Sequence, residues 1–170
     1  MRQQYQNFIF FIVLATAFAA CEPVEYGEMG DPFSKIEGIE GAWIATEVIQ
    51  VDETALAQGG MYTEQDLTEL FNFSSYTITF NIDADTMPST FTVITGGAPS
   101  FIDTTGTWSF NDNNFPTEVL FSHPDSSLFT SKMRLITPPR DQNPLHMKFQ
   151  RFSGGKLIVS YQYTFEKQNQ

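Results

Sequence analysis

The chain of 170 residues is poor in the residue types from which metal sites and basic surfaces are built. It contains one cysteine and two histidines, and its nine Lys and Arg stand against 20 Asp and Glu, which gives a net charge of −11. A single thiol can form no internal disulfide, and it leaves a zinc site without cysteine ligand pairs. Nucleic acids and anionic lipid surfaces require clustered Lys and Arg. The sequence shows no such cluster, so both kinds of partner are excluded.

The sequence also lacks a long hydrophobic run. Its most apolar stretch, Phe8 to Ala20, has thirteen residues, whereas a bilayer-spanning helix needs about 20. A run of this length close to the N-terminus is typical of a secretory signal. The small pair Ala19-Ala20 before Cys21 resembles the lipobox of bacterial lipoproteins. That resemblance implies cleavage before Cys21 and acylation of its thiol, and an ordinary secretory signal with a chance cysteine is the alternative.

These features predict three segments. Residues 1–20 form a lipoprotein signal peptide, residues 21–34 an acidic flexible tether, and residues 35–170 one folded domain. The similarity to lipoproteins of the Bacteroidota type implies a place in the cell envelope. We expect an outer-membrane, lipid-anchored protein that faces either the periplasm or the cell surface.

Apolar and polar residues alternate with period two from Trp43 to the C-terminus, which indicates half-buried antiparallel strands. We predict eight strands, over residues 41–51, 75–81, 90–95, 105–110, 117–121, 129–136, 145–152 and 156–166. Eight strands at nearly regular spacing predict an all-β fold, an eight-stranded antiparallel meander barrel, with a two-sheet sandwich as the alternative.

The long connection after the first strand breaks this alternation. Thr63 followed by Glu64, Gln65 and Asp66 is typical of a helix N-terminus, and Leu67, Leu70 and Phe71 follow at helical spacing. We therefore expect one short helix between the first two barrel strands, in a connection that covers one end of the domain.

The first strand opens with Gly41-Ala42-Trp43, which is similar to the G-x-W motif of lipocalins. In that family the tryptophan closes one end of an eight-stranded barrel. The order of lipobox, acidic tether, G-x-W strand, helical insert and final Tyr-Tyr-Phe strand resembles the lipocalin-like domains of Bacteroidota lipoproteins, a family of largely unknown function. The resemblance implies a barrel over roughly residues 36 to 167.

No reactive constellation is recognisable in the sequence. His123 and His146 fall on different predicted elements, and Asp83-Ala84-Asp85 lacks the glycine and glutamate of a calcium loop. No serine lies in a nucleophile elbow. We therefore expect no enzyme activity, no metal site and no cofactor.

Aromatic side chains on the predicted inner faces are the candidate ligand-lining or core residues. They are Trp43, Tyr76, Phe80, Phe91, Trp108, Tyr161 and Tyr163, with Met133 beside them. A barrel of eight strands is either filled by such side chains or holds one small ligand.

The first functional hypothesis is a non-enzymatic binding module for a small apolar or glycan ligand. The second is an accessory or structural subunit that docks to an outer-membrane protein complex. Thr86 and Thr104 lie in triplets that resemble the D-S/T-x sites of Bacteroidota protein O-glycosylation, so both are candidate glycan attachment sites.

Overall fold

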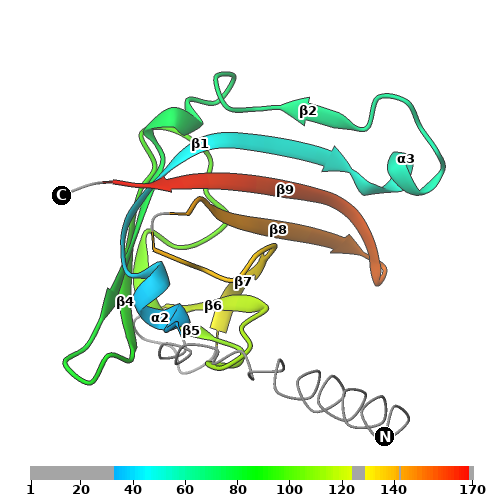
Figure 1. Ribbon diagram of the computed structural model, residues 1–170. Coiled ribbons are helices and arrows are strands. Elements are labelled where there is room, and N and C mark those ends of the chain that lie inside the picture. The colour runs from blue at the N-terminus through cyan, green and yellow to red at the C-terminus, as the bar shows by residue number, and fades with distance from the viewer. Residues whose placement is uncertain (1–32, 124–128, 142, 169–170) are drawn as a thin grey trace, which may run out of the picture. The chain divides into compact units, whose positions relative to one another are not determined.

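The structure is a computed structural model that describes residues 33–123, 129–141 and 143–168; for Phe129 and Thr130 it describes only the backbone. One antiparallel sheet of nine strands has the order β2-β1-β3-β4-β5-β6-β7-β8-β9, and β1 also pairs with β9 (Figure 1). This second pairing closes eight strands into a barrel and leaves β2 as an extra strand beside β1. The predicted barrel is confirmed, and the sandwich alternative is wrong.

The strands of the sheet are β1 (Gly41–Asp52), β2 (Glu64–Asp66), β3 (Thr77–Ile82), β4 (Pro88–Ile94), β5 (Thr105–Phe110), β6 (Glu118–Ser122), β7 (Phe129–Leu135), β8 (Leu145–Ser153) and β9 (Lys156–Lys167). The short helices are α2 (Lys35–Ile39), α3 (Glu53–Ala57) and the 3₁₀ turn η1 (Phe73–Ser75). Each predicted barrel strand agrees with the observed one to within about two residues at either end. None of the helices in the described ranges is long and apolar enough to cross a bilayer.

Strand β1 holds the barrel together because it pairs with three neighbours. One edge pairs with β9 from Trp43↔Lys167 to Asp52↔Val159, with a bulge between Ala45 and Glu47. The other edge pairs with β3 in its first half and with β2 in its second. The bulge adds a residue and bends the strand, so the two halves of β1 serve different partners.

The connection from β1 to β3 differs from the expectation. The helix is α3, which begins after Asp52, whose carboxylate accepts the Ala55 N–H at 2.8 Å. The segment predicted as a helix start at Thr63 instead leads into β2. Leu67 donates its N–H to the Val48 carbonyl at 2.8 Å, and the Val48 N–H donates to Thr68 Oγ1 at 2.9 Å.

The free edge of β1 explains this difference. Its unpaired backbone groups require partners, and the segment from β2 to Thr68 supplies them. The connection therefore widens the barrel wall rather than covering an end, and it sends Phe73 into the core with no exposed surface.

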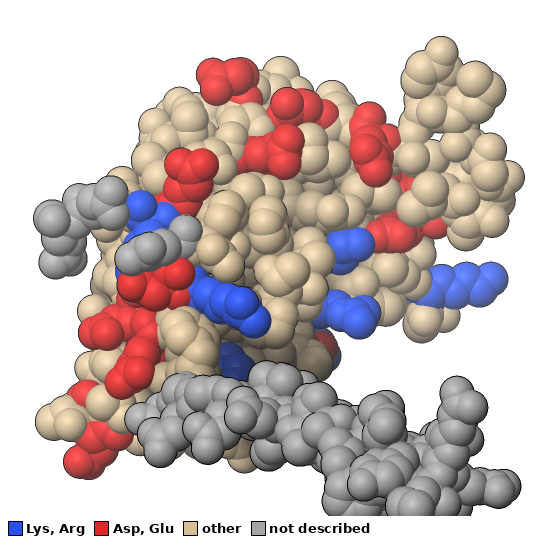
Figure 2. Space-filling model, viewed as in Figure 1, with Lys and Arg blue, Asp and Glu red and all other residues tan. Residues whose placement is uncertain are grey.

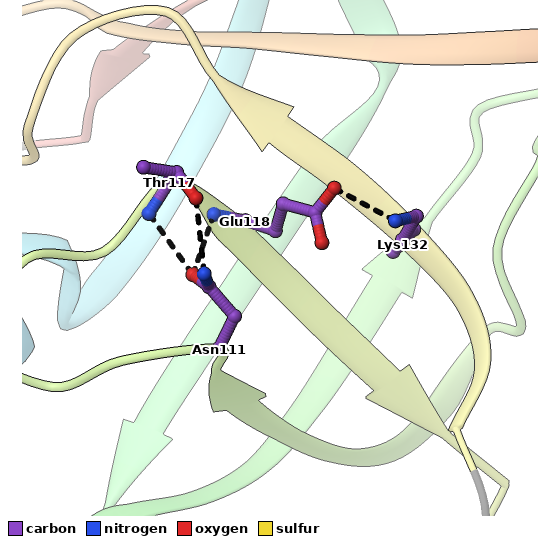
Figure 3. Close-up of polar contacts among 4 residues, drawn as sticks. All are labelled: Asn111, Thr117, Glu118 and Lys132. Carbon is purple, nitrogen blue, oxygen red and sulfur yellow. Dashed lines mark hydrogen bonds and ion pairs between the residues drawn. The ribbon is translucent and has the colours of Figure 1, made fainter.

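The turn of the hairpin between β5 and β6 is built around the side chain of Asn111 (Figure 3). Asn111 Oδ1 accepts the N–H groups of Thr117 at 2.9 Å and of Glu118 at 2.8 Å. Across the next strand pair, Lys132 Nζ lies 2.7 Å from Glu118 Oε1. These contacts fix the turn and tie β6 to β7 on the outer face.

Strands β7 and β8 are paired over a short length only. Their registered pairs are Arg134↔Lys148 and Leu135↔Met147, and the Ile136 N–H donates to the His146 carbonyl at 3.0 Å. Residues 129–133 of β7 and 149–153 of β8 have no registered partner in each other. The barrel wall is therefore split where residues 129–133 face residues 149–153, because the two strands are not registered with each other there.

Candidate binding site at the aromatic end of the barrel

One end of the barrel is closed by α2 and Trp43. Ser34 caps α2 by accepting the Glu37 N–H at 3.3 Å. The Trp43 indole Nε1–H donates to the Ile39 carbonyl at 2.7 Å, and the ammonium of Lys167 lies 5.6 Å from the Trp43 ring centroid. Trp43 and Ile39 are completely buried, so this end is filled by side chains.

The middle of the barrel is filled by aromatic rings that meet edge to face. Phe80 and Trp108 have centroids 5.2 Å apart at 74°, and Phe91 and Phe121 have centroids 5.0 Å apart at 74°. The Trp108 indole N–H donates to the Asn81 carbonyl at 2.8 Å. These rings belong to one continuous core, so side chains fill the middle of the barrel as well as the end closed by Trp43.

At the opposite end three partly buried rings from three elements lie together, and we call it the aromatic end. Phe101 comes from the β4–β5 loop and stacks on Phe149 of β8, with centroids 4.6 Å apart and planes within 3°. Tyr161 of β9 lies 4.4 Å from Phe101 at 37°. Phe149 and Tyr161 are direct cross-strand neighbours, so the loop ring packs on a pair of rings fixed by the sheet.

Two tyrosines, Tyr76 and Tyr163, are buried in the core against which these rings pack. Tyr76 and Ser100 share a hydrogen bond of 3.0 Å, and the Ser100 hydroxyl lies 2.8 Å from the Ile102 carbonyl, to which it donates. Burial raises the pKa of Tyr76 to about 12. Burial also raises the pKa of Tyr163, and the neighbouring hydroxyls of Tyr76 and Tyr161 add to that effect. Neutral phenols in an apolar setting donate and accept hydrogen bonds, so they can orient a polar group of a ligand.

The hydroxyl of Ser131 lies beside the split between β7 and β8. Ser131 of β7 lies on the same face as the buried Met133 and opposite the buried Phe121. Its Oγ is buried, and none of the residues that the structure describes forms a hydrogen bond with it. A buried unpaired hydroxyl costs about 1–3 kcal/mol, so this position favours an incoming polar group.

A polar group on the outer face, which sequence reasoning missed, has a structural role. The Ser160 hydroxyl donates to Glu53 Oε1 at 2.5 Å, and Lys148 Nζ lies 3.6 Å from the same oxygen. This contact holds α3 against β9 and β8. These three residues are far apart in the sequence, so no local pattern could have revealed their contact.

The eight candidate ligand-lining or core residues all belong to, or pack against, one hydrophobic core. Trp43, Tyr76, Phe80, Phe91, Trp108, Met133 and Tyr163 are buried in it, and Tyr161 packs against it. Only Tyr161 lies in the ring cluster at the aromatic end. Sequence reasoning did not single out Phe101 and Phe149; alternation along β8 could have indicated Phe149, whereas Phe101 lies in an irregular loop.

The other candidate positions are dispersed. Thr86 is exposed in the β3–β4 turn with φ of 58°, and Thr104 is exposed just before β5. Cys21 lies outside the described residues. His146 Nδ1 is 3.3 Å from Thr164 Oγ1, and in the described part of the chain no group of three or more His, Cys, Asp or Glu could hold a metal ion.

A closed antiparallel barrel with one end plugged by a tryptophan has the architecture that the lipocalin resemblance implies. The chain matches the family described as "Domain of unknown function (DUF5004)" over residues 20–166. This match spans most of the chain, and the protein belongs to that family, whose function is unknown. No curated protein and no solved structure matches the chain.

Proposed function

We propose that the domain is a non-enzymatic binding module that takes a small apolar or glycan ligand at the aromatic end. The observation that carries this proposal is the parallel stack of Phe101 on Phe149 beside Tyr161, with all three rings partly exposed. Binding sites for small molecules combine aromatic and apolar walls with a few convergent polar groups. The rings supply the walls, and the hydroxyls of Tyr76 and Tyr163 supply the polar groups. The Ser100 hydroxyl is already bonded to Tyr76 and to the Ile102 carbonyl.

Native mass spectrometry of the full-length chain, purified in a mild non-ionic detergent, tests this proposal. We expect a bound small molecule in the wild type and its loss in Phe149→Ala. The matched control is Phe115→Ala, which removes the same side chain from a position 79 % exposed at the other end of the barrel and keeps the ligand. Equal ligand occupancy in both variants would contradict a site at the aromatic end.

We propose further that the protein is a lipoprotein of the Bacteroidota type, lipidated at Cys21 and held at the outer membrane. The support is the order of a short apolar run, a small-residue pair and the lone cysteine. Residues 21–34, with their acids, glycines and prolines, serve as the tether. More than one acyl chain at Cys21 makes the attachment stable rather than transient.

A second candidate function is that of an accessory subunit in an outer-membrane protein complex. It is favoured by the exposed apolar side chains of the β1–β3 connection, where Met61 is 88 % exposed and Tyr62 is 94 % exposed, with Leu56, Leu70 and Phe71 nearby in the sequence. Exposed apolar patches of this kind mark protein interaction sites. Cross-linking in intact cells should capture one stoichiometric protein with the wild type and lose it with Met61→Ser/Tyr62→Ser, while Phe115→Ser retains it.

A further inference from the structure

The positive charges of the domain are concentrated in its last three strands. From residue 36 to residue 131 the chain has no Lys or Arg, whereas Lys132, Arg134, Lys148, Arg151, Lys156 and Lys167 lie on β7, β8 and β9. Figure 2 shows Lys and Arg side chains across the middle of one face and Asp and Glu side chains mostly above them and at the lower left. Three of these cations, Lys132, Lys148 and Lys167, form ion pairs with Glu118, Glu53 and Asp141. The split between β7 and β8 lies among these strands.

Arg151 is placed next to the ring cluster by the strand register. Phe149 pairs with Tyr161, and two residues further along β8, on the same face, Arg151 pairs with Val159. Arg151 is exposed, and no carboxylate of the described residues forms an ion pair with it. Its guanidinium group thus keeps its hydrogen-bond donors available beside the Phe149–Tyr161 pair.

Ser131 stands at the corresponding position on the other side of the split. The pairing of Arg134 with Lys148, continued along both strands, would bring Ser131 opposite Arg151. The strands separate before that point, and within the described part of the chain the buried Ser131 Oγ has no hydrogen-bond partner. The two edges of the split therefore carry, at matching register, a hydroxyl without a hydrogen-bond partner and a guanidinium without an ion pair among the described residues.

We infer that the split between β7 and β8 is an anion-recognising part of the binding site, and that the ligand carries a carboxylate or similar anionic group attached to a ring. Arg151 binds the anion with charge-assisted hydrogen bonds, Ser131 donates a further one, and the ring packs against Phe149 and Tyr161. This inference rests on the proposed binding function and adds the chemical class of the ligand.

Two matched probes test the inference by calorimetry on the full-length chain in non-ionic detergent. They are 4-methylumbelliferyl β-D-glucuronide and 4-methylumbelliferyl β-D-glucoside, which share their rings and differ by a carboxylate in place of a hydroxymethyl group. We expect the glucuronide to bind the wild type about tenfold more tightly than the glucoside. Arg151→Gln should abolish this preference, Arg151→Lys should keep part of it, and Lys156→Gln should leave it unchanged.

The outcomes separate this inference from the function on which it rests. If the wild type binds both probes equally and Phe149→Ala binds neither, the anion preference is overturned. The proposed binding function is then retained. If the wild type binds neither probe, the inference is overturned for ring-bearing acids. If the native mass spectrum shows no bound small molecule, the proposed binding function itself is overturned. A preference that survives Arg151→Gln in a folded variant excludes Arg151 as the anion-binding group.

Discussion

The ring of Phe101 lies parallel to the ring of Phe149, with 4.6 Å between the centroids and 3° between the planes. One ring belongs to the loop between β4 and β5, and the other to a strand that is not adjacent to either in the sheet. The contact therefore spans the barrel interior and attaches an irregular loop to the opposite wall. At the aromatic end it fixes the position of the Phe101 ring, which forms part of the wall of the proposed site.

The stack predicts an energetic coupling between the two rings. Phe101→Leu and Phe149→Leu should each destabilise the domain, and the double variant should lose less than the sum because the ring contact is lost only once. Aromatic pairs contribute about 0.5–1.5 kcal/mol beyond the area they bury. Urea unfolding of all four proteins measures the coupling, and strictly additive losses would show that the rings touch without stabilising each other.

The Trp43 hydrogen bond predicts a specific cost for losing the indole N–H. Trp43→Phe leaves the buried Ile39 carbonyl without its donor and removes part of the ring, so we expect a loss of about 3 kcal/mol in unfolding free energy. Lys167→Met removes only the cation above the ring and should cost less than about 1 kcal/mol. Equal losses in the two variants would contradict a central role for the indole.

The surroundings of Gly106 predict that a larger residue there would destabilise the domain through steric clashes and not through backbone strain. A Cβ at this position in β5 would collide with the Ser122 carbonyl and the Phe91 ring, whereas a Cβ at Gly97 would meet open space at a φ of +92°. We expect Gly106→Ala to cost about 3 kcal/mol and Gly97→Ala about 1–2 kcal/mol. Thermal unfolding ranks the two variants, and the reverse order would show that β5 shifts to make room.

The raised pKa of the buried Tyr76 hydroxyl predicts that the folded state loses stability at alkaline pH. Because burial raises its pKa from the ordinary value of 10.0 to about 12, the folded state keeps the proton that the unfolded state releases. This contribution is complete below about pH 10 and falls by roughly 2 kcal/mol as the pH rises to about 12. Tyr76→Phe should flatten this decline in urea unfolding midpoints but not remove it, since the pKa of Tyr163 is also raised.

The proposed anchor predicts a change of fractionation. Cys21→Ser should release the protein from the membrane fraction, because the acylated residue is lost while the described domain is unaltered. Immunoblotting after a carbonate wash measures this. Retention of the variant in the washed membranes would overturn lipidation at Cys21 as the means of attachment.

Alternation along the chain was sufficient to predict the eight barrel strands. Each inner face is a period-two row such as Met133 and Leu135 on β7, so burial itself determines the pattern. The helix in the first connection was predicted to start at Thr63, but it begins after Asp52. Capping signals are present at both places, and the exposed edge of β1 draws Glu64–Asp66 into β2.

The candidate site was harder to predict than the fold. The period-two alternation of apolar residues identified Tyr161 as an inward-facing residue. The stacking of Phe101 on Phe149, however, depends on the path of the irregular β4–β5 loop across the barrel. The split beside Ser131 depends on where β7 and β8 separate, and strand pairing over a distance leaves no local trace in the sequence. The inward direction of each aromatic side chain can therefore be predicted from the sequence, but which of these side chains contact one another cannot.

The pairing of Trp43 with Lys167 has a kinetic consequence, because it joins the first barrel strand to the last. Contacts between residues so distant along the polypeptide carry a large loop-closure entropy and slow the search for the native state. The cylinder can close only after its final strand is available. A nascent chain that lacks β9 would keep one long edge of β1 unpaired, exposed to association with other chains until synthesis is complete.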